Sequence, residues 1–357
     1  MRILITGGAG FIGRYFCELL RAGGTPINVL DLVTPDFDTG GARCTVGDVR
    51  DPAAVADAVQ GCDRVLHLAA AHHDFGIDHD TYYDVNQNGS RVLCNAMDNA
   101  GITDCVFFSS VAVYGEAPEP HDEGAPTDPR HPYGGSKLAG EKVFHEWVSR
   151  GGGRRCLVIR PTITFGPRNF ANMYSLIRQI DSGRFARVGK GDNVKSLSYV
   201  ENIVQATMFL WEKRRSDPAA PAIDTFNFVE KPDLTSAQIA DQIYSSLGKK
   251  PWPFAIPMWV ALLGALPFDA VIKLTGKNLP VSSMRVKKLF ETRTKFEADK
   301  LAAAGWKSPV SLNDGLDRMS KWYLAEGKRQ PAVWRTPPAR IGDAPGTTSM
   351  KGKRSAG

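Results

Sequence analysis

Residues 3–13 read ILITGGAGFIG, a short apolar run that passes directly into spaced glycines. The glycines follow the pattern GxxGxxG, and an amphipathic stretch from Phe11 to Ala22 comes next. Glycine at such a junction allows a tight turn, lets the backbone approach a pyrophosphate and lets the helix pack closely on the strand. The N–H groups at the start of the helix would face the phosphates. The stretch therefore predicts a dinucleotide site made by Gly7, Gly10, Phe11, Ile12 and Gly13.

An acid closes the second apolar run, Ile27 to Leu30. A carboxylate at Asp31 would accept hydrogen bonds from both ribose hydroxyls of NAD and repel the 2′-phosphate of NADP. Asp48 and Val49, in GDVRD, are expected to contact the adenine. The alternatives are a glycine turn without a nucleotide and, for Asp48, an acid at a helix start. The predicted cofactor is NAD.

Strand-like and helical segments alternate over the first two-thirds of the chain. Three further apolar runs, Val65 to Ala71, Val106 to Ser110 and Cys156 to Ile159, are separated by helical patterns at Thr81–Asn99 and Tyr133–Ser149. This alternation is typical of βαβ units in a parallel sheet. We predict an α/β fold with a doubly wound parallel sheet of the Rossmann type and a smaller C-terminal substrate lobe.

The pattern loosens after Gly166, where helical pieces at Ser236–Leu247 and Leu312–Leu324 mix with a strand candidate at Thr225–Val229. We expect three parts. They are an NAD-binding domain at 1–166, with 195–228 as a candidate addition to it, a substrate lobe at 167–327, and a basic, disordered tail at 328–357.

Composition excludes several classes of protein. Of the 357 residues, 43% are hydrophobic and 23% are charged, which is ordinary for a soluble protein and unlike a disordered or polytopic membrane protein. Six cysteines show neither a CxxC pair nor zinc spacing, so we expect reduced thiols, no metal and a cytoplasmic location. The start, MRILITGG, turns glycine-rich too early for a signal peptide. No partner among nucleic acids is expected.

The excess of positive charge lies at the C-terminus. From Lys328 onward there are seven Lys/Arg and one Asp, a surplus equal to the whole net charge of +6. The segment is rich in Pro, Gly, Ser and Thr, which favours a solvated tail. The alternative is an anchor to an anionic membrane surface, where each base could contribute on the order of 1 kcal/mol.

Pro251 to Phe268 is a stretch of 18 residues without a charge. Four prolines disfavour a transmembrane helix. A buried helix of the lobe and a helix lying at the membrane interface both remain open, because Trp252, Trp259 and Phe268 suit that boundary. Basic residues, ten against four acids between Lys249 and Lys300, surround the stretch.

A second constellation carries acid–base chemistry. Tyr133-Gly-Gly-Ser-Lys137 is a YxxxK at a helix start, and residues i and i+4 share a helix face. A phenol with a reference pKa of about 10 needs nearby positive charge to act as a base near neutrality. Lys137 and the nicotinamide of NAD would supply that charge. The strand end at Ser109–Ser110 delivers a hydroxyl to the same cleft.

With these motifs, the sequence resembles the extended short-chain dehydrogenase/reductase family of NAD-dependent sugar epimerases and dehydratases, over roughly residues 1–325. The resemblance implies that Tyr133 is the general base and acid, that Lys137 lowers its pKa and holds the nicotinamide ribose, and that Ser110 bonds the reacting oxygen. It also implies a homodimer through the helices at 81–99 and 133–149. Further cofactor contacts that it implies are Leu68, Ala69 and Ala70, in HLAA, and Pro161.

Three departures from the family pattern argue against a dehydratase and against an ordinary UDP-glucose or UDP-galactose substrate. Dehydratases place Asp-Glu after the catalytic hydroxyl, where this chain has Val111 and Ala112. UDP-galactose epimerases carry an Asn where this chain has Ile163. Their usual Arg is here Lys195, which lacks the bidentate fork.

Motifs spread along the chain are similar to bacterial 4-epimerases that act on N-acetylglucosaminyl-diphospho-undecaprenol: YYDVN at 82–86, IRPTITFG at 159–166, and LLGALPFDAVIKLTGK at 262–277. We therefore predict an NAD-dependent 4-epimerase of a diphospho-linked N-acetylhexosamine, working through a 4-keto intermediate for surface polysaccharide (O-antigen) synthesis and touching the inner membrane from the cytoplasm. The alternatives are a soluble UDP-GlcNAc or UDP-glucose 4-epimerase, an NAD(P)H-dependent 4-keto-sugar reductase or sterol-type dehydrogenase, and a non-catalytic NAD sensor. Candidate substrate contacts are His72, Arg168, Lys195 and Arg285.

Overall fold

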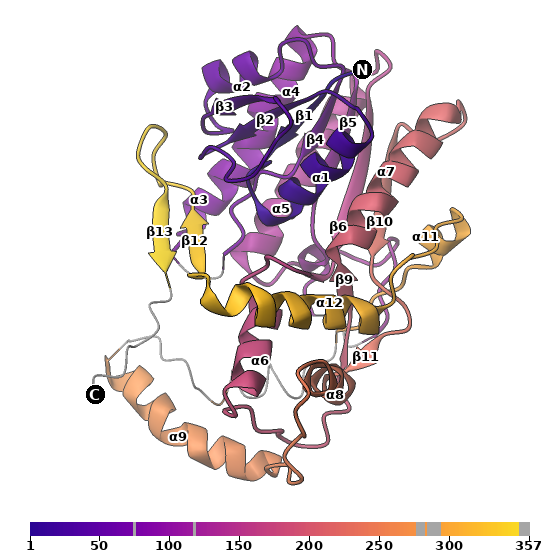
Figure 1. The fold of residues 1–357 in the computed structure, drawn as a ribbon. Helices are drawn as coiled ribbons and strands as arrows, with labels where there is room; N and C mark the ends of the chain where they lie inside the picture. Colours follow the sequence, from indigo (N-terminus) through magenta and orange to yellow (C-terminus); the bar gives the residue numbers. More distant parts are fainter. Residues whose placement is uncertain (74–75, 117–118, 276–282, 284–293, 350–357) are drawn as a thin grey trace.

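A parallel seven-stranded sheet forms the centre of the protein (Figure 1), in a computed structural model that describes residues 1–73, 76–116, 119–275, 283 and 294–349. The strand order is β10-β6-β5-β4-β1-β2-β3, and each neighbouring pair is parallel. The strands are β1 (Ile3–Thr6), β2 (Ile27–Asp31), β3 (Arg43–Val46), β4 (Arg64–His67), β5 (Asp104–Phe108), β6 (Arg155–Pro161) and β10 (Ile223–Phe228). The doubly wound Rossmann-type sheet predicted from the sequence is confirmed.

Alternation along the strands gives the sheet two apolar faces. In β1, Ile3 and Ile5 pack with one set of helices, and Leu4 packs with the other set, because successive side chains of a strand point to opposite faces. The first set is α1 (Phe11–Ala22) and α7 (Val200–Ser216). The second set is α2 (Pro52–Ala58), α4 (Gly89–Asn99) and α5 (Pro132–Ser149). Both faces are covered, as a parallel sheet requires.

The sheet order reverses between β1 and β4. Such a switch point is where open α/β sheets bind ligands, beyond the carboxyl ends of the strands. The loop after β1 and the loop after β4 meet there, since the Leu68 N–H donates to the Thr6 carbonyl at 3.0 Å. The fold therefore brings the glycine loop beside residues 68–73.

A smaller lobe with its own core follows β6. Its main helices are α6 (Asn172–Asp181), α8 (Ser236–Ser246) and α12 (Leu312–Ala325), and α12 crosses below the sheet (Figure 1). Short strands complete it: β7 (Ile163–Phe165) pairs with β9 (Leu197–Tyr199), and β8 (Val194–Lys195) pairs with β11 (Leu234–Thr235). Of the residues expected to return to the first domain, α7 packs against the central sheet and β10 is its edge strand, whereas β8 and β9 lie in the small sheets.

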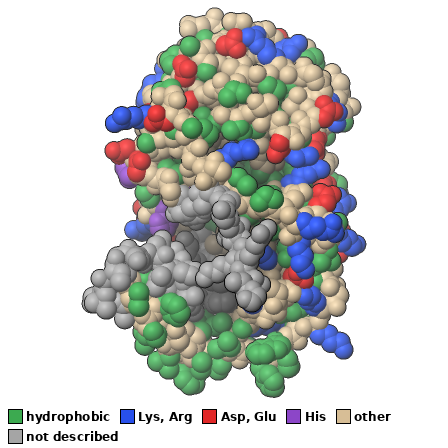
Figure 2. Space-filling model, turned by 60° about the vertical axis from the view of Figure 1, so that its left-hand side comes forward, with side chains coloured by type: hydrophobic (Ala, Val, Ile, Leu, Met, Phe, Trp, Pro, Cys, Tyr) green, Lys and Arg blue, Asp and Glu red, His purple; other side chains and the backbone are tan. Residues whose placement is uncertain are grey.

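The uncharged stretch at 251–268 is a surface feature. It leads into α9 (Met258–Thr275), where Ala265 is buried but Trp259 is 65% exposed, and Trp252 before the helix is 69% exposed. The buried-helix alternative is therefore wrong, because α9 lies at the edge of the lobe, away from its core (Figure 1). Hydrophobic side chains gather at this lower end of the molecule (Figure 2). Within the described residues, no helix is long and apolar enough to cross a bilayer.

The C-terminal segment differs from the expected disordered tail. Residues 328–349 continue from α12 through η3 (Gly327–Arg329) into an antiparallel hairpin of β12 (Val333–Thr336) and β13 (Gly346–Ser349). Composition alone favoured a solvated chain, but backbone carbonyls of this segment bind side chains of the NAD-binding domain. The last eight residues, 350–357, lie outside the described residues.

Candidate active site

The glycine loop forms a tight turn with one open side. Gly7 has φ +71°, and a Cβ built on it would lie 2.7 Å from the Ala69 nitrogen. A Cβ on Gly13 would lie 2.3 Å from the Gly7 carbonyl oxygen, so both positions require glycine. Gly10 is exposed, and a Cβ built on it would have only that same carbonyl oxygen, at 3.1 Å, as a close neighbour. The open side is thus at Gly10, beside the half-buried Phe11 and Ile12 at the start of α1.

Asp31 lies at the carboxyl end of β2, beside the glycine loop. Its carboxylate accepts hydrogen bonds from the backbone N–H of Ala9 at 2.9 Å and of Val33 at 3.3 Å. Burial raises the pKa of Asp31, and these backbone donors oppose the rise. The acid is thus held next to the open turn, which fits the ribose of NAD.

The two residues expected to contact the adenine, Asp48 and Val49, follow β3, but both already contact other parts of the protein. Val49 is buried in the core. The Asp48 carboxylate is paired with Arg50, whose Nη2 lies 2.7 Å from Oδ2 and whose Nε lies 3.0 Å from Oδ1. Leu68, Ala69 and Ala70 are half-buried at the switch point. The open glycine turn, the held acid and this loop form a cradle that fits NAD.

The three residues predicted to be catalytic come from β5 and α5. Ser110 follows β5 and caps the short helix η2 (Val111–Tyr114), accepting from the Ala112 N–H at 3.1 Å. Tyr133 and Lys137 lie on the first turns of α5. A Cβ on Gly134 would lie 2.3 Å from the Ala112 carbonyl oxygen, so glycine at this position lets α5 touch η2. This contact brings the start of α5 up to the strand end that carries Ser110.

Lys137 is a buried cation. Its side chain is packed inside the domain, with Nζ 4.4 Å from the centre of the Phe107 ring. Burial lowers the pKa of Lys137 to about 7, and the negative charge of Glu141 opposes the fall. An ammonium group with so low a pKa can change its charge near neutral pH, which suits a group that tunes a neighbouring phenol.

Asn86 ties the loop after β4 to the catalytic helix. It lies in a short π-helix, η1 (Asp84–Asn88), which follows α3 (His79–Tyr83) and runs into α4. Its amide exchanges hydrogen bonds with the backbone of Ala71, at 2.8 and 3.0 Å, and donates to the Ser136 hydroxyl at 2.8 Å. Single turns of π-helix between α-helical segments are frequent at functional sites. These contacts make Asn86 a structural support between this loop and α5.

A buried polar network lies beneath the three predicted catalytic residues. Glu141 accepts from the Ser109 hydroxyl and binds Arg160 in a fork, with oxygen–nitrogen distances of 2.9 and 2.6 Å. Arg160 donates to the Tyr114 hydroxyl at 2.7 Å, which donates to Asn227 on β10 at 2.8 Å. Apart from Ser109 at the strand end, sequence reasoning gave none of these residues a role. The spacing YxxxKxxxE was the available signal, because it places an acid on the buried face of α5.

The predicted substrate contacts are dispersed. Arg168 has φ +69° and pairs with Glu18 of α1 at 3.2 Å, so its charge is already engaged. His72 is exposed, and its Nδ1 lies 3.2 Å from the Ala70 carbonyl oxygen. Lys195 is half-buried in β8, and Pro161, the remaining cofactor candidate, ends β6. Arg285 lies outside the described residues.

A nucleotide cradle and a Ser-Tyr-Lys set that share one sheet edge define the extended short-chain dehydrogenase/reductase class. A family model described as "NAD dependent epimerase/dehydratase family" matches residues 3–224. The chain belongs to this family.

The relatives include an epimerase named for a lipid-linked sugar and epimerases named for nucleotide-linked sugars. The chain is 38% identical over 328 residues to the N-acetyl-alpha-D-glucosaminyl-diphospho-ditrans,octacis-undecaprenol 4-epimerase of Escherichia coli O157:H7, covering 92% of this chain and 96% of the relative. It is 26% identical to a UDP-glucose 4-epimerase of Vibrio cholerae, covering 92% and 97%.

Solved structures support the fold. The UDP-glucose 4-epimerase of Thermus thermophilus, in complex with NAD, has a TM-score of 0.70 at 23% identity and covers 91% of this chain and 100% of that one. A dTDP-glucose 4,6-dehydratase of Streptomyces venezuelae with NAD has a TM-score of 0.73 at 23% identity, covering 92% and 98%. The fold is thus shared by epimerases and dehydratases, and the choice between them depends on the site residues.

Proposed function

We propose that the protein is an NAD-dependent 4-epimerase that interconverts the GlcNAc and GalNAc forms of a sugar linked through diphosphate to undecaprenol, for surface polysaccharide synthesis. Similarity to the Escherichia coli lipid-linked epimerase along nearly the whole chain supports this substrate. The observation that favours a lipid-linked substrate over a soluble nucleotide sugar is α9, an exposed apolar helix on the substrate lobe.

We assign the acid–base chemistry of the reaction to three side chains, those of Tyr133, Lys137 and Ser110. NAD, when bound, supplies the acceptor that takes the hydride from C4 of the sugar and gives it back. Tyr133 removes the proton from the 4-hydroxyl and later returns it to the 4-keto oxygen. The Lys137 ammonium stabilises the phenolate, and the Ser110 hydroxyl donates to the oxygen at C4. The sugar turns between the two transfers, so that the hydride returns to its other face.

The residues after Ser110 favour epimerisation over dehydration. Elimination of water needs an acid and a base beside the reacting carbons. Val111 and Ala112 occupy the positions that the family's dehydratases fill with Asp-Glu, and neither can exchange a proton. The 4-keto sugar is therefore reduced again and does not lose water.

The substrate's lipid defines where the enzyme works. Undecaprenyl diphosphate lies at the membrane face, and α9 with Trp252 and Phe254 presents aromatic and aliphatic side chains that suit the interface. We infer a cytoplasmic protein that touches the inner membrane peripherally. We also propose a homodimer through α4 and α5, as the family resemblance implies.

A paired assay tests the function. Purified protein receives UDP-GlcNAc in one tube and GlcNAc-diphospho-undecaprenol in the other, and released sugars are separated. Conversion of the lipid-linked sugar alone supports the proposal. Conversion of the UDP-sugar alone would make this a soluble nucleotide-sugar epimerase. Net consumption of NAD(P)H with a keto-sugar would instead identify a reductase.

A further inference from the structure

The end of the chain crosses back from the substrate lobe to the NAD-binding domain. After α12, Lys328 pairs with Asp181 at 2.6 Å, and Ala332 is buried in the lobe core. Residues 335–349, which we call the C-terminal strap, then leave the lobe and lie near α3 (Figure 1). The strap thus links the two parts of the molecule at the edge of the nucleotide cradle.

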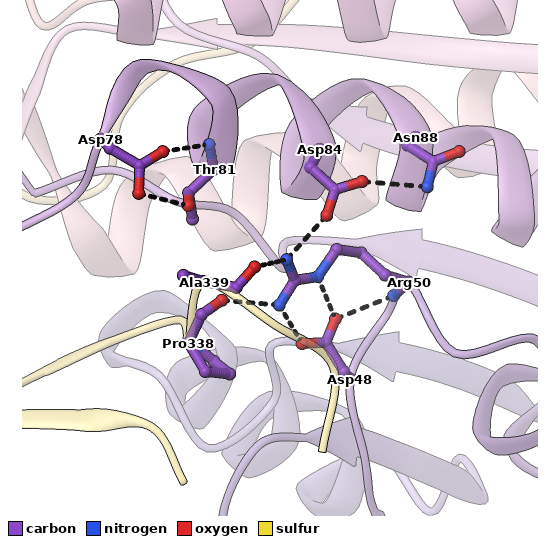
Figure 3. A network of polar contacts seen from close by, with 8 residues as sticks. All are labelled: Asp48, Arg50, Asp78, Thr81, Asp84, Asn88, Pro338 and Ala339. Carbon is purple, nitrogen blue, oxygen red and sulfur yellow. Dashed lines mark hydrogen bonds and ion pairs between the residues drawn. The ribbon is translucent and has the colours of Figure 1, made fainter. Parts of the chain in front are cut away.

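Arg50 anchors the strap (Figure 3). Its guanidinium is fully buried, and it donates to the carbonyl oxygens of Pro338 at 2.8 Å and Ala339 at 3.4 Å. The same group pairs with Asp48 at 2.7 Å and Asp84 at 2.8 Å. Removing one partner of a buried, paired charge is strongly unfavourable. The strap's carbonyl oxygens therefore complete the set of hydrogen-bond acceptors around the Arg50 guanidinium, which Asp48 and Asp84 of the NAD-binding domain hold in place.

A second contact fixes the strap beside the loop after β4. The His73 Nε2 lies 3.1 Å from the Arg335 carbonyl oxygen. A Cβ built on Gly76 would lie 3.8 Å from the Thr336 methyl group, so the loop and the strap are in near contact. Burial lowers the pKa of His73 to about 4, so the ring is neutral near pH 7 and can donate through Nε2. The strap is thus held at two points on neighbouring loops.

These two points border the region where the adenosine of NAD is expected. Asp31, Asp48 and the loop at 68–73 follow β2, β3 and β4, which present their carboxyl ends to one edge of the sheet. The positive charge of Arg335 acts on Asp31, where it opposes the effect of burial on the pKa. Strap residues therefore lie close to the predicted ribose and adenine contacts alike.

We propose that the C-terminal strap forms the outer wall of the adenosine half of the NAD site and that Arg50 is the residue that positions this wall. An epimerase regenerates its cofactor in every cycle, so NAD does not have to leave between turnovers. A wall fixed by a buried guanidinium slows the exchange of NAD without obstructing the sugar. The inference depends on NAD binding and is independent of which sugar is converted.

The test measures the exchange of bound NAD against labelled NAD in three forms of the protein. One is the full chain, the second ends after Trp334, and the third ends after Ser349. The second form keeps the lobe contacts of Ala332 and Trp334 but lacks the strap. The third is the matched control, because it keeps every strap contact described above. We expect exchange at least about tenfold faster without the strap, which corresponds to about 1.4 kcal/mol, and an unchanged rate in the control.

Arg50→Ala and Arg50→Lys test the anchor. We expect both to speed NAD exchange in the full chain, and Arg50→Lys to add little in the chain that ends after Trp334, because the anchor acts through the strap. Circular dichroism and the melting temperature identify a variant that fails to fold. If Arg50→Ala fails in this way, Arg50→Lys and the truncation still decide. Unchanged or slower NAD exchange on removal of the strap would overturn the proposal, and slower exchange would identify the strap as an obstruction.

Discussion

Glu141 and Arg160 form a buried fork, with Nε 2.9 Å from Oε1 and Nη2 2.6 Å from Oε2. Glu141 lies one turn after Lys137 on α5, and Arg160 lies next to Pro161 on β6. The carboxylate also accepts from Ser109, the residue before Ser110. The fork therefore connects the helix that carries Tyr133 to the strand end that carries the serine.

Removing one half of the fork should destabilise the protein. Glu141→Ala leaves the Arg160 guanidinium buried without its carboxylate, which costs about 3–5 kcal/mol in comparable sites. Urea denaturation measures the loss in the free energy of unfolding. Replacing both residues, as in Glu141→Leu with Arg160→Met, should recover most of it. A double variant that is no more stable than Glu141→Ala would contradict the assignment of the cost to an unpaired charge.

The variant Ser109→Ala tests whether Ser109 positions Ser110 or only stabilises the fold. It removes a single hydrogen bond between β5 and α5, worth about 1 kcal/mol, and leaves the fork intact. We expect kcat to fall by about tenfold because Ser110 loses its fixed place, with NAD content unchanged. Thr207→Ala, which removes a buried hydroxyl from α7 bonded to its own helix, is the control. Equal kinetic effects in both variants would mean that Ser109 has only a structural role.

Tyr133→Phe should abolish epimerisation while NAD stays bound. The substitution removes only the phenolic oxygen, and general acid–base catalysis contributes about 10²- to 10⁴-fold. Turnover and NAD content are measured on the same preparation. Tyr244→Phe, at a buried tyrosine of α8 in the lobe, is the matched control and should keep its activity. Near-normal rates in Tyr133→Phe would exclude the assigned role.

The fold was predictable because its signals are local. The glycine spacing, Asp31 and the alternating apolar runs each lie within one βα unit, and the sheet follows from them. The helices at 236–247 and 312–324 are also found, as α8 (Ser236–Ser246) and α12 (Leu312–Ala325). Local periodicity therefore predicted several elements in each of the two parts of the chain.

The rest of the site depends on pairings between residues far apart in the sequence. Arg168 was a candidate substrate contact, but the fold places it against Glu18 of α1. The strap was predicted to be solvated from its composition, yet Arg50 binds its backbone carbonyls, and every residue carries such a group. No residue type marks a carbonyl that will be used in this way. Such contacts join residues far apart in the sequence, so only the three-dimensional structure reveals them.

The exposed face of α9 should bind membranes. Trp259→Glu with Leu263→Glu places two charges on side chains that are more than half exposed. Binding to anionic vesicles, measured by sedimentation, should fall at least about tenfold, because burial of each large apolar side chain contributes about 1.5–3 kcal/mol. The fold should be unaffected, since neither side chain belongs to a core.

Leu324→Glu, at an exposed leucine of α12, is the control for the vesicle experiment. It adds a charge to a different surface and should leave sedimentation with vesicles unchanged. If the α9 variant binds vesicles as well as the control, α9 is not the membrane contact. Conversion of the lipid-linked sugar would then have to be explained by another surface.

His67 should make stability depend on pH. The ring is fully buried at the end of β4, with Nδ1 2.7 Å from the Thr6 hydroxyl and Nε2 3.2 Å from that of Ser90. Burial, aided by the charge of Lys137, lowers the pKa of His67 to about 3, against about 6.5 for an unfolded chain. Between these values the unfolded state binds more protons, so stability is complete above pH 6.5 and falls with decreasing pH, by up to about 1.4 kcal/mol per pH unit.

The variant His67→Gln keeps polar groups near Thr6 and Ser90 but cannot titrate. We expect it to be less stable than the native protein at pH 7, by about 1–2 kcal/mol. Its stability should also change less between pH 6.5 and pH 4, because one source of proton uptake on unfolding is gone. Urea denaturation at several pH values measures both effects, with the exposed His145→Gln on α5 as control. Parallel pH profiles for the native protein and His67→Gln would show that His67 is not the buried group that titrates.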